Sequence, residues 1–254
     1  MNRQQLAYFE RWAVRYETSP LQRCYFRPVH EAALRHVRRH APLGARVLDV
    51  GCGTGSFLRQ ARQLLDRPRL YGVDVTSGMV KVAEGIEAAR PQGDRAIRFM
   101  TATVEQLPFA AESFDVVAST LSFHHWSDQR RGVEEISRVL KPAGLVVLAD
   151  HFACGWLRPF FATVGKRPMM RTDQEVEAML WGAGLRTSSW EVAHCLRRLV
   201  RQGRGRPRPH VAGPSVPLVF LTTAYGPAAA ARCPDQAGTR PSWLTSGDCG
   251  QWLP

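Results

Sequence analysis

One short segment constrains the fold of this chain more than any other. The apolar run 46–50 ends at a turn that carries three alternating glycines, Gly51, Gly53 and Gly55. Glycine allows backbone conformations that other residues avoid, and it lets a ligand approach the main chain closely. A helical pattern opens directly after the third glycine, over residues 56–65. A buried strand, a glycine turn and a helix in this order are typical of the ligand-binding edge of an open α/β sheet.

Strand and helix patterns alternate along most of the chain, which favours a parallel sheet with helices on both faces. We expect strands at 46–50, 70–73, 97–101, 114–119, 145–149, 185–196 and 216–223. We expect helices at 4–17, 28–40, 56–65, 77–89, 129–140 and 173–182. Residues 141–144 (KPAG) predict a helix stop and a turn before the fifth strand. Right-handed crossovers make a doubly wound sheet the expected architecture.

Composition excludes several classes of protein. No stretch approaches eighteen consecutive apolar residues, so no membrane-spanning helix is expected, and the first residues lack the apolar core of a signal peptide. The six cysteines contain no C-x-x-C pair, which speaks against a zinc site and against a compact disulfide framework. We therefore expect a cytoplasmic protein with reduced thiols and no bound metal.

The formal net charge of +12 is unevenly distributed. Residues 1–40 carry a net charge of +5 and residues 186–208 carry +6, whereas 41–185 carry only +1. The excess suits contact with an anionic membrane surface or an acidic partner, but 31 of the 34 basic residues are arginine. Arginine-biased coding explains that usage equally well, and we favour it. The Gly-, Pro- and Arg-rich stretch 201–217 predicts an exposed loop, and 226–254 predicts a disordered tail.

The glycine turn does not fit a phosphate-binding loop. Its third glycine follows the second by only two residues, unlike the dinucleotide pattern, and no G-K-[ST] triplet is present. Two carboxylates lie nearby instead, because Asp49 ends the first strand and Asp74 ends the second. An acid at the tip of the second strand is placed to accept hydrogen bonds from ribose hydroxyls. The combination suits a ligand with a ribose and a positive charge and without phosphates.

Five blocks of sequence occur in an order and at intervals typical of one enzyme family, and they cover about residues 44–150. They are VLDVGCGTG (47–55), YGVDVTSGMVKVA (71–83), EQLPFAAESFDVV (105–117), LSFHHWSD (121–128) and RVLKPAG (138–144). With these blocks the chain resembles the class I S-adenosylmethionine-dependent methyltransferases, in the small-molecule subgroup similar to the quinone-biosynthesis C-methyltransferases. The resemblance implies a mostly parallel, seven-stranded Rossmann-like sheet over 41–225, with 216–223 as its reversed strand and 1–40 as a helical lid.

The resemblance also implies which residues hold S-adenosylmethionine. The backbone of Gly51, Gly53 and Gly55 packs against the methionine part, and Asp49 helps to position its amino group. Asp74 binds the ribose hydroxyls. Each role has a structural alternative, because Asp49 could instead cap the turn and Asp74 could have only a local structural role.

Three more positions are implied around the adenine and the sulfonium. Met79 packs on the adenine in such enzymes, although a methionine on a helix is often part of the core. Where the family has Asp-Ala-Glu, this chain has Thr103-Val104-Glu105. Thr103 brings no carboxylate, so adenine recognition is weaker or shifts to the backbone amide of Val104. Ser119, at the end of the fourth strand, lies beside the sulfonium.

The molecule that accepts the methyl group is expected to bind where the fourth and fifth strands end. His124 and His125 follow the fourth strand, while Asp150 and His151 follow the fifth. Methyl transfer is an in-line displacement, and a neutral imidazole can remove a proton from the acceptor near physiological pH. The three histidines are therefore candidate catalytic residues, although each could instead only hydrogen-bond the backbone. Their spacing does not favour a metal site.

Aromatic residues flank the proposed cleft, and they suit a flat, apolar molecule. They could equally belong to the core. They are Phe9, Trp12, Tyr16, Trp126, Phe152, Trp156 and Phe160. The leading hypothesis is therefore methyl transfer to a small apolar or aromatic metabolite.

Two alternatives stay open at this point. One is an RNA or DNA methyltransferase that uses the Arg-rich flank. The segment after the fourth strand reads Ser-Thr-Leu-Ser rather than the Asn-Pro-Pro-Tyr typical of base-flipping enzymes, and no RNA-binding module is visible. The other alternative is a non-catalytic relative that only binds the cofactor, which the departure at Thr103 permits.

Overall fold

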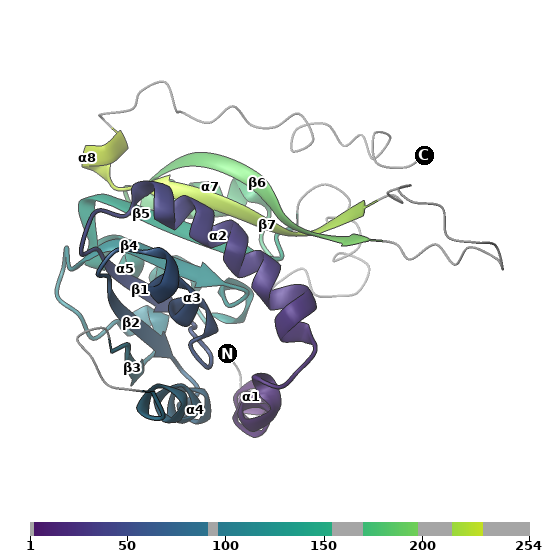
Figure 1. Ribbon diagram of the computed structural model, residues 1–254. Helices are drawn as coiled ribbons and strands as arrows, with labels where there is room; N and C mark the ends of the chain where they lie inside the picture. The colour runs from purple at the N-terminus through teal and green to yellow at the C-terminus, as the bar shows by residue number, and fades with distance from the viewer. Residues whose placement is uncertain (1–2, 91–95, 154–169, 198–214, 231–254) are drawn as a thin grey trace, which may run out of the picture.

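A seven-stranded mixed sheet organises the chain in the computed structural model, which describes residues 3–90, 96–153, 170–197 and 215–230 (Figure 1). The strand order is β3-β2-β1-β4-β5-β7-β6. The strands are β1 (Arg46–Val50), β2 (Arg69–Asp74), β3 (Arg98–Thr101), β4 (Phe114–Thr120), β5 (Leu140–Asp150), β6 (Arg186–Arg197) and β7 (Ser215–Tyr225). The pairs among β1 to β5 are parallel, whereas β7 runs antiparallel to both of its neighbours, β5 and β6. The predicted doubly wound, mostly parallel sheet with a reversed last strand is confirmed.

Helices connect the strands and cover both faces of the sheet (Figure 1). They are α1 (Arg3–Tyr16), α2 (Arg27–His40), α3 (Ser56–Leu64), α4 (Ser77–Ala88), α5 (Gln129–Val139), α7 (Asp173–Gly182) and the short α8 (Pro227–Ala230). Local sequence sets several of their ends. Gly55 precedes α3 with a φ of 82°, and the hydroxyl of Thr172 accepts a hydrogen bond from the backbone N–H of Glu175 in a capping box that starts α7. None of the helices in the described ranges is long and apolar enough to span a bilayer.

Two apolar cores hold these layers together, one on each face of the sheet. On one face, α2, α3 and α4 pack through residues such as Leu34, Phe57 and Val80 against the sheet. On the other face, α5 and α7 pack through residues such as Ile136 and Leu180. Strand residues therefore alternate between the two cores, as a sheet covered on both faces requires.

The amino-terminal segment divides into two parts with different positions. Helix α2 lies along the face of the sheet, where its residues Val29, Leu34 and Val37 are fully buried. Helix α1 lies beside α4 at the far end of the molecule, and a π-helical turn, η1 (Gln22–Phe26), joins it to α2 (Figure 1). Of the two long helices in the predicted lid 1–40, α2 packs on the face of the sheet, whereas α1, together with η1, lies at the carboxyl ends of the strands.

Three local expectations are wrong. The expected turn at 141–144 lies inside β5, which already pairs with Phe114 through Leu140 and resumes regular pairing at Leu145 after an irregularity. Residues 215–217, expected in the exposed loop, begin β7 because they pair with β6. The expected tail starts with α8, which the hydrogen bond from the backbone N–H of Gly226 to the carbonyl of Gly144 ties to β5. Residues 201–214 and 231–254 lie outside the described residues.

Candidate functional site

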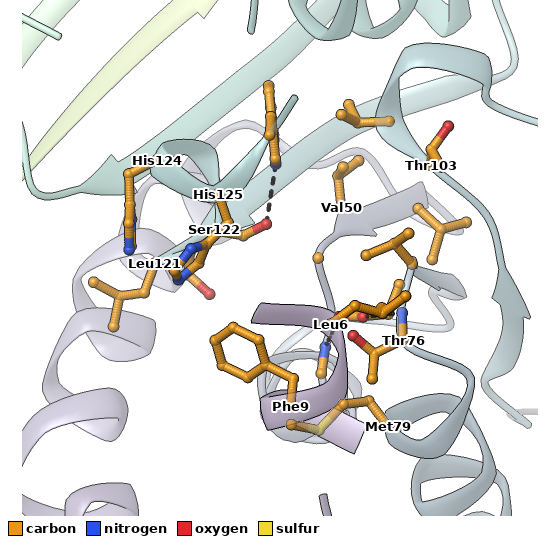
Figure 2. A pocket seen from close by; sticks show the side chains of 18 of the residues that line it. Leu6, Phe9, Val50, Thr76, Met79, Thr103, Leu121, Ser122, His124 and His125 are labelled. Carbon is orange, nitrogen blue, oxygen red and sulfur yellow. Dashed lines mark hydrogen bonds between the residues drawn. The ribbon is translucent and has the colours of Figure 1, made fainter. Parts of the chain in front are cut away.

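A cavity of about 440 Å³ opens at the carboxyl ends of the central strands. It lies next to the point where the strand order reverses, between β1 and β4, which is where open α/β sheets bind their ligands. Its walls come from α1 and η1 on one side and from the segments after β1, β2, β3, β4 and β5 on the other. Figure 2 shows Thr76, Met79 and Thr103 towards one end of the cavity and His124 and His125 towards the other.

The glycine turn forms part of this wall, and its left-handed backbone favours glycine. Gly51 has a φ of 75°, a left-handed conformation that favours glycine. A methyl group on Gly51 would lie 1.8 Å from Oγ of Ser122, and that oxygen accepts a hydrogen bond of 3.0 Å from the indole N–H of Trp126. At Gly53, the ring of Tyr16 lies 3.8 Å from the position a Cβ would take. The turn is therefore enclosed by the next loop and by α1.

Asp74 organises the same turn from the tip of β2. Its Oδ2 accepts a hydrogen bond of 2.9 Å from the backbone N–H of Gly53, and its Oδ1 accepts one of 2.8 Å from that of Thr76. Burial raises the pKa of Asp74, although these hydrogen bonds act in the opposite direction. A carboxylate can accept about four hydrogen bonds, so Asp74 can still bind hydroxyl donors in the cavity.

Two carboxylates of the amino-terminal segment tie α1 to these elements. Oε2 of Glu10 accepts a hydrogen bond of 2.8 Å from the backbone N–H of Gly78 in the first turn of α4, and Oε1 accepts one of 3.1 Å from Ser77. Glu17 accepts hydrogen bonds from Thr54 in the glycine turn and from Arg59 in α3. A carboxylate at a helix N-terminus is favourable for the helix dipole. Helix α1 is thus held against both sides of the cavity.

Three imidazoles line the opposite end of the cavity. Nδ1 of His124 lies 2.6 Å from Oδ1 of Asp150, and Nε2 of His151 lies 2.6 Å from the hydroxyl of Tyr25. The ring of His125 packs between two neighbours, tilted to that of His124 with centroids 3.9 Å apart and edge-on to that of Phe9 with centroids 5.1 Å apart.

Burial and charge set the protonation of this cluster. Burial would raise the pKa of Asp150, but the charge and hydrogen bond of His124, with help from His151, lower it to about 2. Burial, followed by the charge of His124, lowers the pKa of His125 to about 4. Burial and then Asp150 raise the pKa of Tyr25, so its hydroxyl stays protonated. At neutral pH the cluster therefore holds an ionised carboxylate and a neutral His125.

Most residues expected at the site line this cavity. They are Gly51, Gly53, Asp74, Met79, Thr103, Val104, His124, His125 and His151. Asp49, Gly55 and Ser119 are instead buried behind the wall. The roles of all twelve remain predictions.

The aromatic residues divide in the same way. Phe9, Trp12, Tyr16 and Trp126 line the cavity. Phe152 does not, because it is fully buried in the core against Phe123 and Trp190, which is the alternative that the sequence left open. Trp156 and Phe160 lie outside the described residues.

Tyr25 and Phe26 also line the cavity and were not expected there. They lie in η1, where a π-helical turn removes the periodicity that would have placed them on one face. No group of three or more potential metal ligands is arranged to hold an ion among the residues with described positions.

Comparison with known proteins agrees with this geometry. A family model described as "Methyltransferase domain" matches residues 48–148. The chain is 40% identical over 108 residues to the uncharacterized methyltransferase YcgJ of Bacillus subtilis, covering 42% of this chain and 41% of that protein. It is 37% identical over 108 residues to the ubiquinone/menaquinone biosynthesis C-methyltransferase UbiE of Geobacter sulfurreducens, covering 42% of each.

Solved structures show the same fold over a longer stretch. The structure of YcgJ from Bacillus subtilis superposes with a TM-score of 0.60 at 23% identity, over 77% of this chain and 98% of that one. A SAM-dependent methyltransferase from Aquifex aeolicus superposes with a TM-score of 0.52 at 19% identity, over 76% and 88%. The sequence matches span less than half the length of these two curated relatives, so the likeness in sequence covers only part of each protein. Over residues 48–148 the chain is therefore similar to methyltransferase domains, and its fold is the one seen in SAM-dependent methyltransferases.

Proposed function

We propose that this protein transfers a methyl group from S-adenosylmethionine to a small apolar or aromatic metabolite. The observation that supports this most is the single cavity that joins the glycine turn and Asp74 to the aromatic rings of α1 and the three imidazoles. When bound, S-adenosylmethionine supplies an electrophilic methyl carbon on a sulfonium. The protein's task is to hold an acceptor atom in line with that carbon and to exclude water.

The cofactor end of the cavity fits the group chemically. Asp74 offers acceptors for ribose hydroxyls, and Gly51 and Gly53 leave the backbone open to close approach. Behind the turn, Oδ1 of Asp49 has no hydrogen-bond partner among the described residues, and burial followed by the charge of Asp74 raises the pKa of Asp49 well above its usual range. An ammonium or sulfonium near the turn would relieve this unfavourable burial of carboxyl groups.

Adenine recognition differs from the family pattern. Thr103 and Val104 line the cavity where the family pattern has an acidic residue. Met79 on α4 lines the same end of the cavity as Thr103 (Figure 2). We propose that the adenine ring packs between Met79 and Val104, with the hydroxyl of Thr103 as a hydrogen-bond partner. Apolar contact then contributes more of the binding than a carboxylate would.

The acceptor end is aromatic. The rings of Phe9, Trp12 and Tyr16 follow one another along α1, with centroids 6.2 Å apart for the first pair and 4.8 Å for the second. Phe26 continues the series at 5.1 Å from Tyr16. Such a wall offers apolar faces to a flat ring, and it buries little polar surface. These contacts favour a small aromatic metabolite over a nucleic acid, which would need exposed basic side chains along its path.

The test is to incubate the full chain with methyl-labelled S-adenosylmethionine and a cell extract separated into a small-molecule and a macromolecular fraction. The expected result is label in an organic-extractable small molecule, with none in nuclease-sensitive material. Label in RNA or DNA would support the nucleic-acid alternative instead. Binding of S-adenosylhomocysteine with no transfer to either fraction would indicate a non-catalytic relative. Either outcome contradicts the proposal.

A further inference from the structure

The end of β5 carries a buried carboxylate with several donors directed at it. Oδ1 of Asp150 accepts hydrogen bonds of 2.6 Å from the backbone N–H of His151 and from Nδ1 of His124. Its Oδ2 accepts one of 3.2 Å from the backbone N–H of His124. The Asp150 side chain is only 1% exposed, and that of His124 is 12% exposed. Two contacts to one residue fix both the backbone and the ring of His124 against Asp150.

This contact fixes which nitrogen of His124 exchanges protons. An ionised carboxylate can only accept a hydrogen bond, so the proton of the neutral ring lies on Nδ1. The ring then takes up a second proton at Nε2, and the carboxylate stabilises the imidazolium that results. Because His124 lines the cavity, the pair has the composition of a general base directed by a buried acid.

The other two imidazoles are placed differently. His151 bonds through Nε2 to the hydroxyl of Tyr25, and the two rings stack at 6.0 Å and an angle of 15°. Its ring is thus tied to η1. The ring of His125 packs edge-on against Phe9. The short hydrogen bond from a ring nitrogen to the buried carboxylate is the one that His124 makes.

The acids on the cavity wall limit which acceptor this base serves. They are Asp74 and Glu105, and each accepts two backbone N–H groups: Asp74 those of Gly53 and Thr76, Glu105 those of Ser127 and Asp128. An amine acceptor, which is cationic before it loses its proton, gains no charge partner from Asp74, whose remaining acceptor sites are assigned to the ribose, and Oε1 of Glu105 already accepts two backbone N–H groups. A neutral aromatic hydroxyl needs a base and a flat apolar wall, and the cavity provides both.

We propose that His124, oriented by Asp150, is the general base, and that the acceptor is a phenol-type hydroxyl on an aromatic ring. The proposal rests on the proposed methyltransferase function. The hydroxyl proton passes to Nε2 of His124 while the oxygen forms the new bond to the methyl carbon. The carbon–sulfur bond breaks with its electron pair remaining on sulfur, which leaves neutral S-adenosylhomocysteine. The imidazolium then returns its proton to solvent. Asp150 is the positioning residue.

The test uses the full chain, labelled S-adenosylmethionine and 4-substituted phenols that range from phenol to the acidic 4-nitrophenol. General-base removal typically lowers a rate by about 100-fold or more. His124→Gln is expected to lose this much with phenol but little with 4-nitrophenol at mildly alkaline pH, because that probe is already ionised. Asp150→Asn is expected to show the same pattern with a smaller loss. His36→Gln is the matched control. His36 lies on α2, outside the cavity, and its Nε2 is 3.1 Å from a carboxylate oxygen of Glu191, so it is also an imidazole paired with an acid.

A pH profile gives a second readout. The groups that face His124 are Asp150 from β5, His125 beside it, and His151 with Tyr25 behind it. In His124→Gln the methyl-transfer rate should rise with pH only as the phenol itself ionises. The wild type should keep its activity at pH values below the pKa of the phenol. Equal losses for all phenols, or no loss, would overturn the base assignment, and transfer to tertiary amines with none to phenols would overturn the acceptor class.

Binding of S-adenosylhomocysteine is measured for each variant. If the wild type fails to bind it, the proposed function itself fails.

Discussion

Substituting Gly51 by alanine tests the construction of the glycine turn. Alanine at a φ of 75° adds strain of about 1 kcal/mol. The new methyl group would lie 1.8 Å from Oγ of Ser122, so Ser122 must move and its hydrogen bond with Trp126 is lost, at about another 1 kcal/mol. The free energy of unfolding should therefore fall by about 2 kcal/mol. For a chain of this size that corresponds to a Tm lower by roughly 4–8 °C.

Alanine substitutions at two other glycines separate the cost of backbone strain from the cost of displacing Ser122. Gly184 has a φ of 81° but nothing within 4 Å of a Cβ, so Gly184→Ala should show the strain alone, about 1 kcal/mol. Gly85 lies in α4 with nothing within 4 Å, so Gly85→Ala should raise the stability by about 0.5–1 kcal/mol.

Thermal unfolding is measured for each variant with and without S-adenosylhomocysteine. The ligand should raise the Tm of the wild type and of both control variants, but not that of Gly51→Ala, because the turn is displaced. If Gly51→Ala unfolds at the temperature of Gly184→Ala, or keeps its ligand-induced shift, the account of the turn is wrong.

Three further predictions concern the cofactor. Asp74→Asn removes a charged acceptor, so the Kd of S-adenosylhomocysteine should rise by about 10- to 100-fold in a calorimetric titration, and an unchanged Kd would refute the ribose role. Glu10→Gln weakens the contact of α1 with α4, so the ligand should dissociate about two to five times faster in stopped-flow fluorescence. The exposed Glu31→Gln is its control, and equal rates would contradict a lid role. The raised pKa of Asp49 should fall when a cation binds nearby, so binding should release protons and strengthen as pH rises through that pKa. Calorimetry in buffers of different ionisation enthalpy measures this release, which Asp49→Asn should abolish.

The sequence predicted the sheet well because its signals are local. The apolar runs at β1 and β4, the glycine turn and the acid at the end of β2 each follow from a few neighbouring residues. The boundary of β5 was missed because Pro142 and Gly144, which usually end an element, form an irregularity within a strand whose pairing continues on both sides.

The site was harder to predict than the fold. His124 and Asp150 are 26 positions apart, and only the parallel pairing of β4 with β5 brings them together. Tyr25 reaches His151 across 126 positions from a π-helical turn that has no sequence signature. The place of Phe152 stayed open because an aromatic residue near a strand end has the same pattern whether it faces a cavity or the core. Side-chain direction at strand ends depends on tertiary packing that the sequence does not encode locally.

The central claim is that one cavity binds the cofactor at the glycine turn and presents its methyl group to the imidazoles. A crystal structure of the full chain with S-adenosylhomocysteine tests this most directly. The account predicts the ribose hydroxyls within hydrogen-bond distance of Asp74 and the sulfur atom facing the side of the cavity that holds His124 and His125. A ligand bound outside this cavity, or one whose ribose lies away from Asp74, would contradict it.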